Sequence, residues 1–300
     1  MKPKIRLGGG KIMTQDRNFK RLLQARWDQN KFLCVGLDTD LDPIAQMKIP
    51  GMPSDDVLAQ MSYFNQHAVM ATARAAAAYK LNFAFYLGEW PDGLQALYET
   101  VRFIQKHAPE VPIILDTKWN DIGNTNKGYV KYAFDILGVD ALTLNAYMGE
   151  ESLLPFLRYP DKGFFILCKT SNPGSAEFQD LELKDGTTLY QRVAKNVSAV
   201  WENQELGNLG LVVGATYPEE LKIVRRIAPG LPILLPGVGS QAGDLAQAVR
   251  NGQNKRGSGF LVNSSRGILY PKVPEGRSIE QSVGFAADDL SRQISKSFRA

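Results

Sequence analysis

Residues 111–122 read VPIILDTKWNDI, an apolar run that ends in three charged side chains. Its first five residues are typical of a strand buried on both faces, as the strands of parallel sheets are. Side chains alternate along a strand, so Asp116 and Lys118 point to the same face, and Asp121 follows in the next loop. This stretch therefore predicts a parallel strand whose carboxyl end carries a polar site.

Seven further apolar runs of similar length occur along the chain, separated by longer segments of helical period. This alternation indicates βα units, and eight strands favour a closed (β/α)8 TIM barrel over an open doubly wound sheet. The predicted strands span residues 32–38, 79–86, 111–118, 141–146, 164–171, 211–216, 232–237 and 259–264. The predicted helices between them span residues 55–78, 93–107, 124–137, 188–202, 218–227 and 242–250.

The length of 300 residues allows one α/β barrel with terminal extensions. Residues 16–29 predict a helix ahead of the first strand, placed to cap the bottom of the barrel. Residues 278–298 predict the closing outer helix. We therefore expect a single α/β domain, with residues 1–30 as an N-terminal extension and 31–300 as the catalytic barrel.

The composition is that of an ordinary globular protein, with 44% hydrophobic and 22% charged residues. The net charge of +4 comes from basic residues scattered along the chain, which argues for an anionic small molecule rather than a nucleic acid as partner. Cys34 and Cys168 lie in apolar runs and are expected to be buried thiols. No signal-peptide pattern or membrane-length apolar run occurs, so we expect a soluble, cytoplasmic protein.

The charges after the 111–115 run admit two interpretations. Burying two carboxylates and an ammonium group without good pairing costs several kcal/mol per ion, in rough terms. One interpretation is that Asp116 and Lys118 form an ion pair that merely seals the top of the barrel. The other is functional: a lysine held between carboxylates stays protonated, and can act as a general acid beside a developing carbanion.

Two further charged residues lie near the ends of neighbouring predicted strands. Asp38 closes the first strand, and Lys80 opens the second apolar run. Polar residues at the carboxyl ends of barrel strands are the usual carriers of chemistry. With Asp116, Lys118 and Asp121 they would form an alternating Lys-Asp-Lys-Asp network in one cavity.

A second site is predicted on the other side of the barrel. Residues 234–244 read LLPGVGSQAGD, a strand that runs into a glycine-rich loop, and the eighth strand ends in Asn263-Ser264-Ser265-Arg266-Gly267. Loops after the seventh and eighth strands are the usual phosphate position of such barrels. Arg266 can bind a phosphate through two parallel hydrogen bonds. We therefore expect a phosphorylated ligand.

Other motifs fail on context. Residues 8–11, GGGK, lack the spacing and preceding strand of a P-loop, and no Rossmann or nucleophile-elbow fingerprint is present. His67 and His107 lie in predicted helices at no metal-ligand spacing. We therefore expect chemistry that needs neither a metal nor an organic cofactor.

Taken together, these motifs resemble the orotidine 5'-phosphate decarboxylase family, in its longer bacterial form. The resemblance runs from residue 38 to residue 270 and keeps the order of the strands. It rests on Asp116-x-Lys118-x-x-Asp121-Ile122, Gly123-Asn124-Thr125, Thr170-Ser171-Asn172-Pro173-Gly174, Pro236-Gly237-Val238-Gly239-Ser240-Gln241 and Ser264-Ser265-Arg266-Gly267.

The resemblance implies loss of CO2 from orotidine 5'-phosphate to give UMP, the last step of de novo pyrimidine synthesis, without cofactor. It implies that Lys118 donates the proton to C6 of the pyrimidine. Asp116 would crowd the substrate carboxylate, and Lys80 and Asp121 would complete the network. Asp38 and Lys80 would also touch the ribose.

The resemblance also implies the remaining contacts. Ser171 would bond the amide edge of the pyrimidine, and Gln241 would reach the phosphate from a closing lid. Arg266 and the Gly267 region would hold the same phosphate. Asp121 and Thr125 would reach across an interface into a neighbouring subunit's site, so a homodimer is implied.

Two alternatives stay open. The first is a Mg²⁺-dependent sugar-phosphate decarboxylase or aldolase of the same suprafamily, which shares Asp-x-Lys-x-x-Asp; Ser171, Gln241 and the long lid loop favour a nucleotide instead. The second is a barrel that binds a nucleotide as a sensor without catalysis. No feature of the sequence favours the sensor, because every expected charged position is filled.

Overall fold

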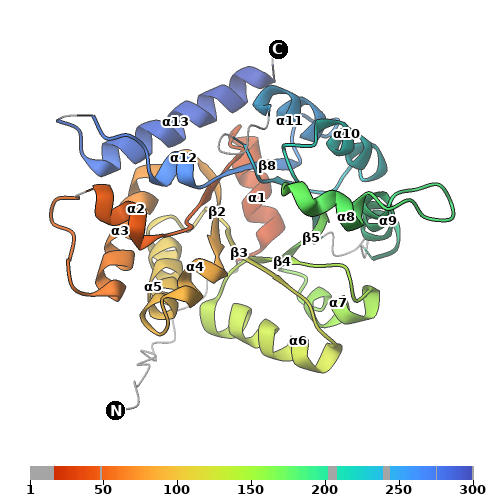
Figure 1. The fold of residues 1–300 in the computed structure, drawn as a ribbon, viewed down its shortest axis with the longest axis horizontal. Coiled ribbons are helices and arrows are strands. Elements are labelled where there is room, and N and C mark those ends of the chain that lie inside the picture. The colour runs from red at the N-terminus through yellow and green to blue at the C-terminus, as the bar shows by residue number, and fades with distance from the viewer. Residues whose placement is uncertain (1–16, 48, 202–207, 239–243, 275, 299–300) are drawn as a thin grey trace.

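The computed structural model describes residues 17–47, 49–201, 208–238, 244–274 and 276–298 of the chain. In this part of the chain eight parallel strands pair in sequence order, and β8 closes on β1. Helices form a ring around the strands, as Figure 1 shows. The (β/α)8 barrel predicted from the apolar runs is therefore confirmed.

The strands are short and lie almost entirely out of contact with solvent. Their apolar side chains fill the barrel interior on one face and pack under the helices on the other, which is why each reads as a continuous apolar run. Their bounds are β1 (Leu33–Gly36), β2 (Ala76–Asn82), β3 (Ile113–Trp119), β4 (Ala141–Leu144), β5 (Gly163–Lys169), β6 (Leu209–Val213), β7 (Ile233–Leu235) and β8 (Phe260–Ser264).

The helices follow the strands in the expected alternation. The α-helices are α1 (Phe19–Asp28), α2 (Leu41–Met47), α3 (Val57–Thr72), α4 (Phe83–Gly88), α5 (Asp92–His107), α6 (Gly123–Val130), α7 (Glu150–Leu157), α8 (Ala176–Gln179), α9 (Leu189–Asn196), α10 (Pro218–Ile227), α11 (Leu245–Gly252), α12 (Arg266–Leu269) and α13 (Ile279–Ser297). The π-helical turns η1 (Lys131–Leu137) and η3 (Val197–Trp201) continue α6 and α9, and η2 (Pro173–Ser175) is a 3-10 turn.

The second strand differs from the sequence prediction at both ends. Residues 76–78 were expected to end a helix, but they are the start of β2, and residues 83–86 belong to α4 rather than to the strand. The alanines of 76–78 are fully buried between neighbouring strands, and this burial overrides their helix propensity. Asn82 ends the strand, because its side chain accepts a hydrogen bond from the Ala84 amide (3.2 Å) and caps α4.

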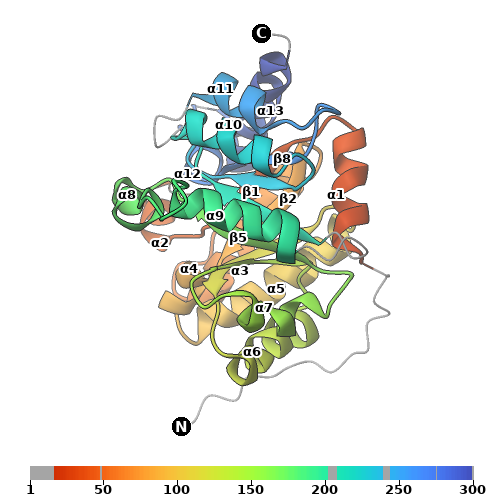
Figure 2. The ribbon, with the colours of Figure 1, turned by 90° about the vertical axis from the view of Figure 1, so that its right-hand side faces the viewer.

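The helix before β1 crosses the N-terminal end of the barrel, as predicted. Phe19 of α1 packs edge-to-face on Phe165 of β5 (5.8 Å between ring centroids), and Trp27 donates a hydrogen bond to the Phe260 carbonyl at the start of β8 (2.9 Å). Figure 2 shows α1 on one side of the barrel and α2 and α8 on the opposite side. The division of the chain at residue 30 stays a prediction.

Both cysteines are buried, as expected. Cys34 lies in β1 and Cys168 in β5, and burial raises the pKa of each thiol to about 12. Within the described ranges, no helix is long and apolar enough to span a bilayer.

Candidate active site

A cavity of about 730 Å³ opens at the C-terminal end of the barrel, which is the size of a small-molecule site. Side chains that follow or end the strands line it, together with the loops around α2 and α8. The polar residues of its wall are Asp38, Asp40, Lys80, Asn82, Asp116, Lys118, Thr143, Thr170, Ser171, Asn172, Gln179, Asn263, Ser264, Ser265, Arg266 and Tyr270.

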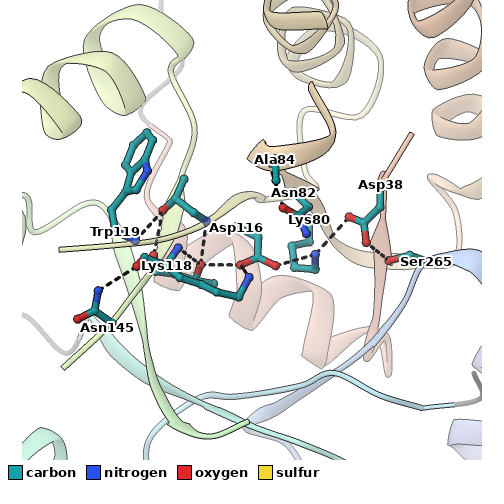
Figure 3. A network of polar contacts seen from close by, with 11 residues as sticks. Asp38, Lys80, Asn82, Ala84, Asp116, Lys118, Trp119, Asn145 and Ser265 are labelled. Atoms are coloured by element: carbon teal, nitrogen blue, oxygen red, sulfur yellow. Dashed lines mark hydrogen bonds and ion pairs between the residues drawn. The ribbon is translucent and has the colours of Figure 1, made fainter. Parts of the chain in front are cut away.

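Four charged residues from three neighbouring strands form one chain of contacts across the cavity floor (Figure 3). The Lys118 ammonium lies 2.6 Å from Asp116 Oδ1, and the Lys80 ammonium lies 3.0 Å from Asp116 Oδ2. Lys80 also lies 3.4 Å from Asp38 Oδ1. The predicted alternation of lysine and aspartate is therefore present, with Asp116 at its centre.

The first strand is built to hold one end of this network. Asp38 Oδ2 accepts a 2.7 Å hydrogen bond from the Ser265 hydroxyl, which follows β8. A Cβ at Gly36 would lie 1.9 Å from Ser265 Oγ, so glycine is required there for that approach. Tyr270 adds a second link, because its hydroxyl donates to the Asp38 carbonyl (2.9 Å) and accepts from the Asp40 amide (2.8 Å).

The network keeps its charges despite its burial. Burial alone would lower the pKa of Lys80, but the carboxylates of Asp116 and Asp38 raise it well above the ordinary value. Burial would likewise raise the pKa of Asp116, but the two lysines, helped by hydrogen bonds, hold it well below its usual range. At neutral pH the cavity floor therefore presents a fixed carboxylate between two ammonium groups.

Lys118 differs from Lys80 in its access to the cavity. Its side chain is 48% exposed, whereas that of Lys80 is 5% exposed. An ammonium group that is half exposed and held by one carboxylate can meet a ligand and donate a proton to it. The structure thus assigns different environments to two lysines that look alike in the sequence.

The second part of the cavity wall comes from the loops after β5, β7 and β8. Ser171, Pro236, Gly237 and Arg266 border the cavity, and Gly237 has a φ of +94°, a conformation that favours glycine. Gly267 borders a neighbouring cavity of about 460 Å³ instead, which Ser264 and Val238 share with the main one. Gln241 lies outside the described residues.

Asp121 and Thr125 do not border the main cavity within this single chain. Asp121 follows β3, where its carboxylate accepts a hydrogen bond from the Ile122 amide (2.6 Å) and its own amide donates to Asn126 Oδ1 (3.0 Å). Thr125 is exposed on α6. The expected contact of Asp121 with the charged network is absent from the described side chains of one chain.

The sequence reasoning missed Tyr270, described above, and two further residues that shape the cavity. Thr143 of β4 donates a 2.7 Å hydrogen bond to Asp116 Oδ1. Lys169, at the end of β5, is fully buried and binds both carboxylate oxygens of Asp180 (2.7 and 2.8 Å), fixing the loop that carries Ser171. Polar residues inside otherwise apolar predicted strands were the available signal for both. In the described ranges, no group of three or more His, Cys, Asp or Glu side chains is arranged to hold a metal ion.

Comparison with known proteins agrees with this geometry. The model of the orotidine 5'-phosphate decarboxylase / HUMPS family matches residues 31–278. The orotidine 5'-phosphate decarboxylase of Thermomicrobium roseum is 45% identical over 252 residues, which are 84% of this chain and 86% of that protein.

Two solved structures from Leishmania donovani are also similar. Its OMP decarboxylase has a TM-score of 0.79 and 36% identity, covering 94% of this chain and 99% of that one. Its UMP synthase has a TM-score of 0.81 and 37% identity, and here the match covers 93% of this chain but 56% of the longer one. From the match to the family model and the 45% identical relative, the chain belongs to the orotidine 5'-phosphate decarboxylase family.

Proposed function

We propose that the Lys80–Asp116–Lys118 network is the catalytic centre for the reaction of this family. The chain is an enzyme of the carboxy-lyase class, and it converts orotidine 5'-phosphate to UMP and CO2. The observation that carries the proposal is the contact between Lys118 and Asp116 at 2.6 Å on the floor of the main cavity. That contact places a proton donor and a fixed negative charge at one point.

Lys118 is the proton donor in this proposal. Loss of CO2 leaves an electron pair at C6 of the pyrimidine, in the plane of the ring, where the π system cannot delocalise it. A half-exposed ammonium group can stabilise that charge and then deliver its proton to the carbon. Asp116 holds the ammonium group at 2.6 Å and would face the departing carboxylate, so that CO2 loss removes a repulsion between like charges.

The remaining cavity residues would each bind a different part of the substrate. Lys80 and Asp38, joined at 3.4 Å, would hold the ribose hydroxyls. Ser171 would bond the amide edge of the base. Arg266 would bind the phosphate, with Gln241 and the Gly267 region completing that site. Binding energy from the remote phosphate can thereby be used to assemble the reacting end of the cavity.

We further propose a homodimer in which Asp121 and Thr125 complete the neighbouring subunit's site. Their position outside the cavity of their own chain supports this arrangement. Exposed apolar side chains follow the same strands: Ile122 is 61% exposed after β3, and Tyr147 is 94% exposed after β4. Such side chains beside the site suit contact with a second copy better than contact with water.

The enzyme is proposed to work in the cytoplasm. Its substrate carries a phosphate group and does not cross a lipid bilayer unaided. Fractionation of cells that make the protein, with immunodetection in each fraction, tests this location.

The function is tested by the change in ultraviolet absorbance when the purified protein meets orotidine 5'-phosphate, with and without EDTA. Conversion to UMP that EDTA does not slow is the expected result. Conversion that EDTA abolishes and Mg²⁺ restores would contradict the metal-free mechanism. Absence of both conversion and UMP binding would favour a sugar-phosphate enzyme of the suprafamily. Absence of conversion by a folded protein that still binds UMP would favour a nucleotide sensor.

A further inference from the structure

The hydroxyl of Thr143 in β4 makes three hydrogen bonds to residues 116–118, which include the two residues that carry the proposed chemistry. Thr143 is 1% exposed, and its hydroxyl donates to Asp116 Oδ1 (2.7 Å). The hydroxyl oxygen of Thr143 also accepts hydrogen bonds from the backbone amides of Thr117 and Lys118, each at 3.0 Å. One donor and two acceptor positions are all that a hydroxyl offers, so its capacity is used in full.

The backbone of β3 is irregular at the point where Thr143 meets it. Leu115 pairs with Leu142 and Trp119 with Leu144, so residues 116–118 stand opposite Thr143 alone. Lys118 has a φ of +54°, in the left-handed region that residues other than glycine rarely adopt. The regular hydrogen bonding between the strands is interrupted here, so the amides of Thr117 and Lys118 have no partner in the ladder. The Thr143 hydroxyl accepts their hydrogen bonds instead.

The irregularity lies at the residue whose ammonium group binds Asp116. Lys118 has a left-handed backbone, and its ammonium group lies 2.6 Å from Asp116 Oδ1, the same oxygen that Thr143 bonds. One hydroxyl therefore contacts both the carboxylate and the backbone on which the ammonium group depends.

We propose that Thr143 is a positioning residue that fixes Asp116 and Lys118 relative to each other. This inference rests on the roles proposed above for those two residues. Thr143 does not act on the substrate itself; its hydroxyl holds the carboxylate oxygen at one point and keeps the turn at Lys118 in place. The other residues of β4 are apolar, so the polar hydroxyl of Thr143 is accounted for by its hydrogen bonds to residues 116–118 and not by packing in the core.

The test compares Thr143→Val, which removes the hydroxyl at nearly constant shape, with Thr143→Ser, which keeps it. Thr100→Val is the matched control, because Thr100 is equally buried but bonds Ala96 and Asn65 in the outer helices. We expect kcat to fall about 100-fold in Thr143→Val, the scale of a displacement of about 1 Å at a reacting centre. Thr143→Ser should stay near wild type, and UMP affinity should change less than about threefold in all three variants.

The split between kcat and binding separates positioning from a loss of stability. The groups that face Asp116 are Lys80 from β2, Lys118 from β3 and Thr143 from β4. Loss of positioning lowers kcat of the folded protein at nearly unchanged UMP affinity in Thr143→Val and not in Thr100→Val, whereas a loss of stability alone lowers the fraction folded and leaves kcat per folded molecule unchanged. If the valine variant fails to fold, Thr143→Ala removes the same hydroxyl and replaces it in the comparison.

Three results would overturn the proposal: a kcat of Thr143→Val within threefold of wild type, an equal loss in Thr143→Ser, or a loss of UMP affinity in Thr143→Val as large as its loss of kcat. A failure of the proposed function looks different, because wild type and Thr100→Val would then be inactive as well. In that case acylation of Lys118, followed by mass spectrometry against pH, still tests the positioning. Identical acylation profiles in wild type and Thr143→Val would refute it.

Discussion

Replacing Lys118 by alanine is expected to stop turnover while leaving the fold and UMP binding nearly intact. The side chain is 48% exposed, so its removal opens little buried space. Asp116 keeps Lys80 at 3.0 Å and the Thr143 hydroxyl at 2.7 Å, and is not left as an unpaired buried charge. The cost in folding free energy should therefore be small, on the order of 1 kcal/mol.

The loss in rate can be built from two contributions. A positioned general acid is worth roughly 10²- to 10⁴-fold, and removing one stabilising group from a developing charge costs roughly 10²- to 10³-fold. Their product is about 10⁴- to 10⁷-fold in kcat/KM, or about 5–10 kcal/mol at 1.36 kcal/mol per decade.

The assay follows absorbance of orotidine 5'-phosphate at high enzyme concentration, with UMP binding measured by calorimetry. Lys127→Ala is the control, since Lys127 is an exposed lysine of α6 that bonds Asn124 (3.2 Å) away from the cavity. Turnover of Lys118→Ala within tenfold of wild type would refute the role of Lys118 as proton donor. A parallel loss of UMP binding would refute the claim that the alanine variant keeps its site.

Three further predictions concern other parts of the site. The pKa of Asp116 is lower in the folded than in the unfolded state, so its carboxylate stabilises the fold above about pH 3.9 and this contribution is lost as the pH falls. Below that pH, the free energy of unfolding should fall more steeply in wild type than in Asp116→Asn, by up to about 1.4 kcal/mol per pH unit. Urea unfolding at pH 3 to 7 measures this, and parallel curves would contradict it. Inactive Lys118→Ala and Asp121→Ala proteins, mixed under subunit exchange, should recover about a quarter of wild-type activity, because half the dimers are mixed and each then has one intact site. No recovery despite proven exchange would place Asp121 in the site of its own subunit. Arg266→Ala should lower kcat/KM for the phosphorylated substrate about 10- to 100-fold and leave the nucleoside orotidine unaffected; equal losses on both would refute a phosphate contact.

The barrel could be predicted from sequence because its signal is repeated eight times. Each strand is buried on both faces and must be apolar throughout, and each is followed by a segment of helical period. Residue 76 shows where this reasoning fails. Alanine favours a helix by intrinsic propensity, and only its pairing with the neighbouring strand makes it part of β2.

Most of the charged network was predictable for a related reason: the carboxyl ends of barrel strands converge, so Asp38, Asp116 and Lys118 had to lie near one another. Lys80 did not follow from this rule, because the predicted strand began at residue 79; it lies near the carboxyl end because β2 begins at residue 76. The part played by Thr143 was not predictable. It depends on a shift in the pairing of β3 with β4 and on a left-handed residue at Lys118, and neither has a sequence signature here. Contacts that need a second copy of the chain lie beyond what one chain's pattern can specify.

The labelling rates of the two buried thiols report how the closed barrel opens. Cys34 in β1 and Cys168 in β5 lie four strands apart, on opposite arcs of an eight-stranded ring. With a pKa of about 12 and almost no exposure to solvent, each thiol is expected to react with a disulfide reagent only after its strand has opened. Equal labelling rates at the two positions would mean that the ring opens as one cooperative unit. Faster labelling at one cysteine would show that the strands around it unfold first.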